Sequence, residues 1–192
     1  MEVYPISIKH ATCYLVKVSD FYIAIDAGWS GYINEYYKMM HKYGINQEKI
    51  RYLFVTHFHP DHAGLVKDIK HFGTTFVIMK HQIPYIESME KILAKERSYT
   101  KIELSTSRII DICEAGRFFN TNHIPAQIIR TTGHTEDSIS IIFDDGDTFV
   151  GDLYRQNLVM EDDIKSRESW ELLKRSGAKR IHFAHGEENY LI

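Results

Sequence analysis

The sequence predicts an α/β fold of the four-layer αββα type, in which two mixed β-sheets pack face to face with helices outside. Segments with strand-like alternation come in two blocks, and segments with helical spacing follow each block. The chain has 192 residues, of which 44% are hydrophobic, and this is enough to form one substantial core. We therefore expect a single domain over residues 1–192, without internal repeats or linkers.

The first block is expected to begin with a meander of three strands, because apolar and polar residues alternate and residues 19–20 (Ser-Asp) fit a tight turn. Residues 34–43 have the spacing of a helix that Gly44 ends, and a second helix is expected to follow His62. Residues 82–97 combine helical spacing with mixed charge. The expected strands of this block are 3–8, 12–18, 21–25, 52–55 and 76–79.

The second block is expected to consist mainly of strands. Strand-like segments dominate from residue 109 to 150, and residues 144–147 (Asp-Asp-Gly-Asp) fit a hairpin turn. A last helix is expected at 168–176, followed by a final strand. This order places one group of strands and helices after another, as the sandwich requires.

A cluster of possible metal ligands follows the expected strand 52–55. Residues 56–62 read Thr-His-Phe-His-Pro-Asp-His, so four ligand-type side chains, His57, His59, Asp61 and His62, stand within six positions. Imidazole and carboxylate groups suit zinc, iron and manganese, and a strand end holds such ligands on a rigid support. Pro60 fits the first position of the following helix. The cluster therefore predicts a metal site rather than a polar turn with solvated histidines.

The spacing His-x-His-x-Asp-His resembles the signature of the metallo-β-lactamase superfamily. The resemblance implies a third histidine for the first ion in a Gly-His-Thr turn, and His134 matches it. It implies an aspartate that bridges two ions and a last histidine before a glycine, matched by Asp152 and His185. It also implies an early aspartate behind the ligands, matched by Asp26. The resemblance spans nearly the whole chain and implies the same αββα fold.

The resemblance implies two divalent metal ions, with zinc expected and iron or manganese as alternatives. Neutral histidines leave most of the charge on the ions, so a water between them can ionise near neutral pH and attack an electrophilic carbonyl or phosphorus. In the implied ligand set, His57, His59 and His134 bind one ion, Asp61, His62 and His185 bind the other, and Asp152 binds both.

Some residues are also candidates for catalysis or for lining the site around the ions. Asp61 and Tyr154 are the candidate catalytic groups, and the Tyr154 hydroxyl is a possible donor to the substrate oxygen or the leaving group. The alternative is that Tyr154 only fills space. Trp29 and Ser30, which follow Asp26, are expected to line the pocket mouth. Residues 82–97 either cover the active site or form a helix packed against the core.

Departures from individual family members narrow the expected substrate. Only seven residues follow His185, where members resembling glyoxalase II carry a further helical domain, and Asp152 stands where true β-lactamases lack the bridging aspartate. We expect a hydrolase acting on an ester, thioester or lactone of a small molecule. The alternatives are a mononuclear iron oxygenase resembling persulfide dioxygenase, a phosphodiesterase of the same superfamily, or a binding protein that keeps the site without catalysis.

Composition and the remaining polar residues set the other expectations. The net charge of −3 and the pI near 6.4 predict no nucleic-acid partner, and the oligomeric state stays open. Two isolated cysteines, Cys13 and Cys113, are expected to be buried and favour a reducing compartment. With no apolar run long enough to span a bilayer, we expect a cytoplasmic protein without a membrane partner. Six histidines are expected to be structural or exposed: His10, His41, His71, His81, His123 and His182.

Overall fold

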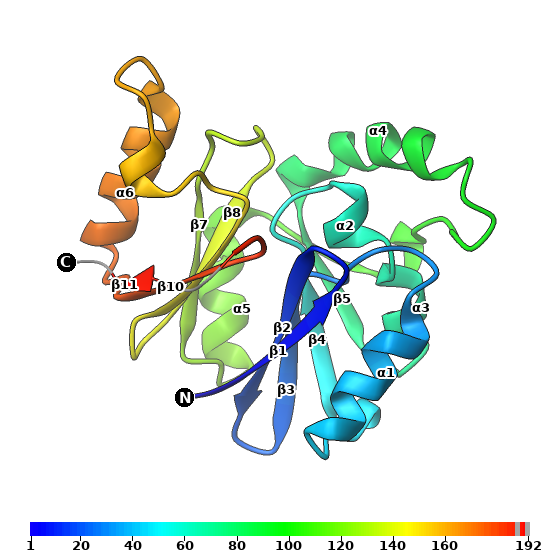
Figure 1. The fold of residues 1–192 in the computed structure, drawn as a ribbon. Coiled ribbons are helices and arrows are strands. Elements are labelled where there is room, and N and C mark those ends of the chain that lie inside the picture. Colours follow the sequence, from blue (N-terminus) through cyan, green and yellow to red (C-terminus); the bar gives the residue numbers. More distant parts are fainter. Residues whose placement is uncertain (187–188, 191–192) are drawn as a thin grey trace. The chain divides into compact units, whose positions relative to one another are not determined.

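The structure, a computed structural model, describes residues 1–186 and the backbone of residues 189–190. It divides into two compact units, Met1–Ile110 and Asp111–Ile192, and each unit contains one mixed sheet with helices (Figure 1). The expectation of a single domain stays a prediction, and the two units are described one at a time.

The first unit is built on a six-stranded sheet in the order β1-β2-β3-β4-β5-β6. The three strands of the expected meander pair antiparallel, and the remaining strands pair parallel, so the sheet is mixed. The strands are β1 (Glu2–Ile8), β2 (Ala11–Val18), β3 (Phe21–Ile25), β4 (Ile50–Phe54), β5 (Thr75–Met79) and β6 (Arg108–Ile110).

Helices of the first unit share a hydrophobic core with this sheet. The buried side chains Tyr36, Met40, Ile69 and Met89 come from three of the helices and pack in one cluster with strand residues such as Leu53. The helices are α1 (Ile33–Lys42), α2 (Pro60–Ala63), α3 (Val66–Lys70) and α4 (Ile83–Leu93), with the short 3-10 helices η1 (Gln47–Lys49), η2 (Lys80–Gln82) and η3 (Leu104–Thr106).

The second unit is built on a five-stranded sheet in the order β11-β10-β9-β8-β7. Only β9 and β10 pair parallel, and the other neighbours are antiparallel. Trp170 and Leu173 of α6 pack on sheet residues such as Val150 and Ile181. The elements are η4 (Ile112–Glu114), α5 (Ala115–Thr121), β7 (Ala126–Arg130), β8 (Ile139–Phe143), β9 (Asp147–Gly151), η5 (Gln156–Leu158), α6 (Ile164–Arg175), β10 (Arg180–Phe183) and β11 (Asn189–Tyr190).

Three expectations about helices need correction. The helix after His62 is interrupted, because Gly64 packs against backbone atoms of another loop and α3 begins only at Val66. The stretch expected to hold mainly strands contains α5. The last helix begins at Ile164 rather than at 168, since the side chain of Asp163 accepts a hydrogen bond from the Ser166 N–H and caps its start.

None of the helices within residues 1–186 has the length and apolar character needed to cross a bilayer.

Candidate metal centre

In the first unit, two parallel strands deliver the candidate ligands to one edge of the sheet. Asp26 directly follows β3, and His57 lies three residues beyond the end of β4. The strands are in register with Ile25 beside Phe54, and the Asp26 N–H donates to the Phe54 carbonyl at 2.8 Å. Because the carboxyl ends of parallel strands share an edge, residues 30 positions apart are brought together.

Asp26 organises the ligands without standing among them. Its backbone has φ of +62°, which is uncommon for a residue with a side chain, and the side chain is buried. Its carboxylate accepts hydrogen bonds from the Thr56 N–H at 2.7 Å, from the Thr56 hydroxyl at 2.9 Å and from Nδ1 of His62 at 2.8 Å. Since a carboxylate only accepts here, Nδ1 of His62 carries the proton and Nε2 holds the lone pair suited to a metal.

The candidate ligand atoms of this unit lie at separations that one ion could bridge. Nε2 of His57 is 3.1 Å from Nδ1 of His59, and Nε2 of His62 is 3.7 Å from Oδ2 of Asp61. Two ligand atoms bound at about 2.1 Å to a tetrahedral ion are separated by roughly 3.4 Å. His57 and His62 are buried, whereas His59 and Asp61 are partly exposed. The unit therefore presents two pairs of ligands with suitable spacing.

Two residues outside the cluster hold its backbone in place. The amide of Gln82, which is buried at the start of α4, donates to the carbonyl groups of Val55 at 3.0 Å and Thr56 at 3.3 Å. A Cβ on Gly64 would lie 2.3 Å from the Ser30 nitrogen, so only glycine permits this approach. The ligand loop is thus fixed from two sides.

In the second unit, three strands end at a common edge with a candidate ligand after each. His134, Asp152 and His185 follow β7, β9 and β10, whose directions agree. The register pairs Phe183 with Gly151, so the residues after β9 and β10 leave the sheet side by side. The three side chains are therefore neighbours although up to 51 positions separate them in the sequence.

Asp152 directs each carboxylate oxygen toward a different histidine. Its Oδ2 lies 3.5 Å from Nε2 of His134, and its Oδ1 lies 3.4 Å from Nε2 of His185. Both distances match the separation of roughly 3.4 Å expected for two ligands on one ion. This is the geometry that a carboxylate needs if each of its oxygens is to serve a separate ion.

Helix α6 supports the loop that carries His134. The hydroxyl of Ser169 donates to the Thr132 carbonyl at 2.6 Å. Gly133 has φ of +139°, and a Cβ there would lie 2.3 Å from the Ser166 hydroxyl oxygen. The position of His134 therefore depends on the packing of α6 as well as on the strand before it.

Tyr154 lies beside the second-unit ligands. Its ring is edge-on to His134, with the centroids 6.0 Å apart, and its side chain is 52% exposed. Its backbone carbonyl accepts a hydrogen bond of 2.9 Å from the indole N–H of Trp170. The tyrosine is held near a candidate ligand while its ring faces solvent, and its role in catalysis stays a prediction.

The loop after Asp26 holds the residues expected at the pocket mouth. Trp29 is partly buried, with the Lys9 ammonium 5.0 Å from the centre of its ring. The Ser30 hydroxyl lies 3.1 Å from the Ser98 hydroxyl, which belongs to the segment after α4. Of the segment 82–97, α4 covers residues 83–93, and Ile86, Met89 and Leu93 pack into the first-unit core.

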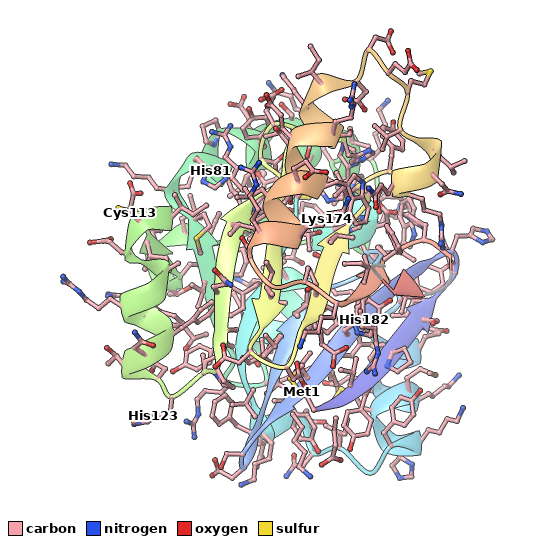
Figure 2. All side chains as sticks on the ribbon, turned by 90° about the vertical axis from the view of Figure 1, so that its left-hand side faces the viewer. Met1, His81, Cys113, His123, Lys174 and His182 are labelled. Carbon is pink, nitrogen blue, oxygen red and sulfur yellow. The ribbon has the colours of Figure 1, made fainter. Side chains whose placement is uncertain are left out.

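The two cysteines differ from each other. Cys13 is buried as expected, and burial, together with the charges of Asp26 and Asp61, raises the pKa of its thiol well above the usual range. Cys113 is exposed, which corrects the expectation of burial. It lies in η4 beside the start of α5, and its thiol donates to Asp111 at 3.3 Å (Figure 2).

Histidines outside the candidate ligand set vary in exposure. His182 is buried, with Nε2 2.7 Å from Oδ1 of Asp147 and its ring stacked on Phe149 (Figure 2). His81 is half-buried, and the exposed members are His10, His41, His71 and His123.

Three supporting residues carry no signal in the sequence that identifies their roles. Thr56 links Asp26 to the histidines, since its hydroxyl oxygen lies 3.2 Å from Nδ1 of His57, and only its place next to the cluster hints at this. Gln82 and Ser169 act through contacts between distant elements. Such contacts depend on the tertiary fold and leave no local pattern.

Comparisons with known proteins agree with this description. A family model described as the metallo-beta-lactamase superfamily matches residues 8–185. The chain is 29% identical over 177 residues to the probable metallo-hydrolase MJ0888 of Methanocaldococcus jannaschii. The aligned region covers 86% of this chain and 82% of that protein.

Two solved structures are similar in fold. The crystal structure of TTHA1623 in a di-iron-bound form matches 98% of this chain and 94% of its own, with a TM-score of 0.75 and 20% identity. A metallo-β-lactamase of Cronobacter sakazakii matches 96% of this chain and 75% of its own, with a TM-score of 0.67 and 17% identity. The predicted fold class, mixed α/β with two mixed sheets and helices, is confirmed.

Proposed function

The chain belongs to the metallo-β-lactamase superfamily, and from this membership we propose that it is a hydrolase that depends on two divalent metal ions. Its relative in Methanocaldococcus jannaschii, named a probable metallo-hydrolase, supports the metal-dependent hydrolase class. The proposed substrate is a small molecule with an ester, thioester or lactone bond.

The observation that carries the proposal is the geometry of Asp152, whose two oxygens face His134 and His185 at 3.5 and 3.4 Å. A carboxylate so placed suits the bridging role that the family pattern implies. We propose that the ligands divide as the family pattern divides them. One ion takes His57, His59 and His134, the other takes Asp61, His62 and His185, and Asp152 serves both.

The residues of the chain have distinct tasks in this proposal. When bound, the ions would supply a water that ionises near neutral pH and a positive charge that polarises the substrate oxygen. Asp26 keeps the proton of His62 on Nδ1, and Thr56 fixes the Asp26 carboxylate. The hydroxyl of Tyr154, whose ring lies beside that of His134, is the proposed donor to a substrate oxygen or leaving group.

Zinc, iron and manganese all accept this set of imidazole and carboxylate ligands. We propose zinc as the metal, and the di-iron form of TTHA1623 supports iron as the alternative. A mononuclear iron oxygenase is the second candidate function, because the same imidazole and carboxylate ligands accept iron. Metal content per chain and oxygen consumption separate the two functions.

We also propose that the protein acts on free small molecules rather than on nucleic acid. The net charge of −3 supports this, because no overall positive field would attract phosphate backbones. Two free cysteines support a cytoplasmic location, where thiols stay reduced.

The first experiment is elemental analysis of protein purified without chelator, combined with a hydrolysis panel of esters, thioesters, lactones and phosphodiesters. Two metal equivalents with turnover on one of the first three classes support the proposal. Turnover only on phosphodiesters moves the assignment to a phosphodiesterase, and one iron per chain with oxygen uptake moves it to the oxygenase.

Variants at the proposed ligands test the mechanism. We expect His59→Ala and Asp152→Ala to abolish hydrolysis in a folded protein, with the exposed His41→Ala as the matched control. Full activity of Asp152→Ala with one metal lost contradicts the bridging role. Tyr154→Phe should lower turnover if its hydroxyl acts, and unchanged kinetics remove it from the mechanism.

A further inference from the structure

Helix α6 and the segment before it expose an unusual amount of apolar surface. Four large apolar side chains stand in solvent, with exposed fractions of 67% for Leu158, 71% for Met160, 63% for Ile164 and 41% for Leu172. Of these four, Ile164 and Leu172 line one depression, and although single exposed apolar residues are common, apolar side chains grouped on one surface mark an interaction site. We call the exposed side of residues 156–175 the α6 surface.

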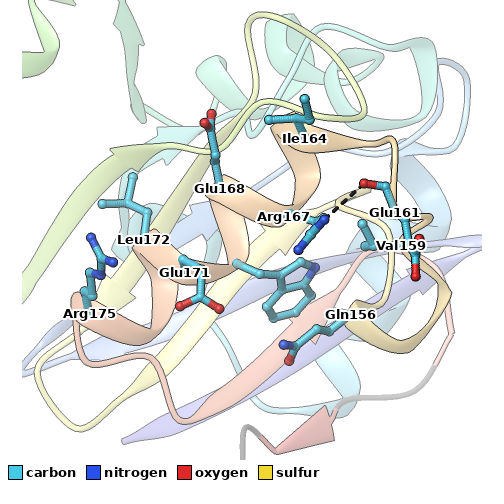
Figure 3. A pocket seen from close by; sticks show the side chains of 10 residues that line it. Gln156, Val159, Glu161, Ile164, Arg167, Glu168, Glu171, Leu172 and Arg175 are labelled. Atoms are coloured by element: carbon cyan, nitrogen blue, oxygen red, sulfur yellow. Dashed lines mark hydrogen bonds between the residues drawn. The ribbon is translucent and has the colours of Figure 1, made fainter.

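The α6 surface is hollowed as well as apolar. A depression of about 900 Å³ lies against it, with Val159, Ile164 and Leu172 on its walls and charged side chains between them (Figure 3). Trp170 is buried and is fixed by its hydrogen bond to the backbone of Tyr154. Trp170 therefore gives the depression one fixed wall, whereas most of the other lining residues are exposed.

One face of α6 carries a stripe with a regular order of apolar and charged residues. The stripe members recur three or four positions apart or stand next to one another, which places them on one side of the helix, and all are exposed. The stripe consists of Ile164, Glu168, Glu171, Leu172 and Arg175, and the exposed Glu161 precedes it in the segment before the helix.

Acidic residues stand before α6 and basic residues stand in its last turn. Three acidic residues, 161–163, precede the helix, Lys174 and Arg175 lie in its last turn, and Lys165 and Arg167 add positive charge near its start. Two such helices that lie antiparallel bring the acidic start of each to the basic end of the other. Opposite charges then meet at both ends of the pair.

We propose that the α6 surface binds the same surface of a second copy of this chain, with the two α6 helices antiparallel across a two-fold axis. A pairing centred on Glu168 places Ile164 opposite Leu172 of the second copy, and places Glu161 opposite its Arg175. The apolar contacts form twice, as do the charge pairs, because the interface is self-complementary. The interface core removes the exposed apolar side chains from water.

The register has one unfavourable feature that gives a sharp test. Glu168 lies at the centre, so the two copies bring like charges together. Glu168→Gln should therefore strengthen the dimer. Arg175→Glu and Glu161→Lys should each weaken it about 10-fold or more, and the double variant should recover most of the affinity because the charges are exchanged in both copies.

The experiment is sedimentation equilibrium of the full chain over a wide range of concentrations. We expect a mass that rises to twice the chain mass of 22.5 kDa. Leu172→Asp should give the monomer, whereas Ile92→Asp, at an exposed apolar position in α4, should not change the association. Circular dichroism of each variant verifies that it is folded.

Several results overturn the proposal. They are a monomer at every concentration, a dimer that Leu172→Asp leaves intact, or charge reversals whose combination is weaker than either alone. None of the residues exchanged in these variants is a proposed metal ligand, so metal content and turnover measured on the same samples separate a failure of the dimer from a failure of the proposed hydrolase.

Discussion

Replacing Asp26 by asparagine tests how the protein selects the metal-binding nitrogen of His62. Oδ2 of Asp26 accepts from Nδ1 of His62 at 2.8 Å, while Oδ1 accepts from the Thr56 N–H and hydroxyl at 2.7 and 3.0 Å. An amide has only one oxygen, so asparagine keeps the Thr56 donors only by turning its NH2 group toward His62. The imidazole must then accept at Nδ1 and carry its proton on Nε2.

The expected loss of metal affinity follows from the loss of the carboxylate oxygen that orients His62. Removing a carboxylate that orients a ligand histidine typically lowers metal affinity about 10- to 100-fold, or about 1.4 to 2.7 kcal/mol. Asp26 is only 3% exposed, so solvent does not screen this loss. The protein without metal also loses a hydrogen bond to a charged group, and we expect its free energy of unfolding to fall by about 1.5 to 3 kcal/mol.

The assay is competition for zinc against a chromophoric chelator near neutral pH. Nitrogen-15 NMR of the imidazole shows in parallel which nitrogen of His62 carries the proton. Asp20→Asn, the same exchange at an exposed turn, serves as the control. If Asp26→Asn binds both metal equivalents with the affinity of the wild type, the reasoning about the tautomer is wrong.

Four further variants test predictions about stability. Gly64→Ala should lower the free energy of unfolding by about 1 to 3 kcal/mol, because its Cβ would lie 2.3 Å from a backbone nitrogen. The control is Gly116→Ala in α5, where an added Cβ has no neighbour within 4 Å, and it should raise the free energy of unfolding by up to about 1 kcal/mol. Equal changes of melting temperature in the Gly64 and Gly116 variants contradict the prediction. Gln82→Leu should lower the free energy of unfolding by about 1 to 3 kcal/mol, because it removes the donor to two backbone carbonyl groups. An unchanged urea midpoint would show that these hydrogen bonds do not stabilise the ligand loop. Burial raises the pKa of Asp68, so its ionised form opposes folding, and Asp68→Asn should stabilise the protein at neutral pH. That gain should shrink as the pH falls toward the ordinary pKa of 3.8, and a gain independent of pH refutes it.

The sequence allowed most strands and the first-unit ligand cluster to be predicted, because their signals are local. Alternation over five to eight residues predicted β1 to β3, and four ligand-type residues between 57 and 62 predicted a metal site. His134 and Asp152 lie in short motifs that are common by chance. Only the resemblance to a family identified them.

Features that depend on contacts between distant residues escaped prediction. Helix α5 includes Gly116 and two adjacent phenylalanines, which favour helix poorly, and it directly follows η4, whose start is closed by a capping box of Asp111 and Glu114. The exposure of Cys113 follows from its place in that cap, since a cysteine alone indicates burial. Gln82 has no local pattern that reveals two acceptors 26 and 27 positions away.

The close contact at Gly64 restricts how the mouth of the first-unit site can vary. Position 64 nearly touches the backbone of residues 28 and 30, and the Ala27 N–H donates to the His62 carbonyl at 2.6 Å. The loop that carries Trp29 and the short helix that carries His62 are therefore joined as one rigid block. An insertion in this loop would displace a proposed metal ligand together with the residues expected at the pocket mouth. A change of substrate preference on this side must accordingly come from exchanging side chains at a constant loop length.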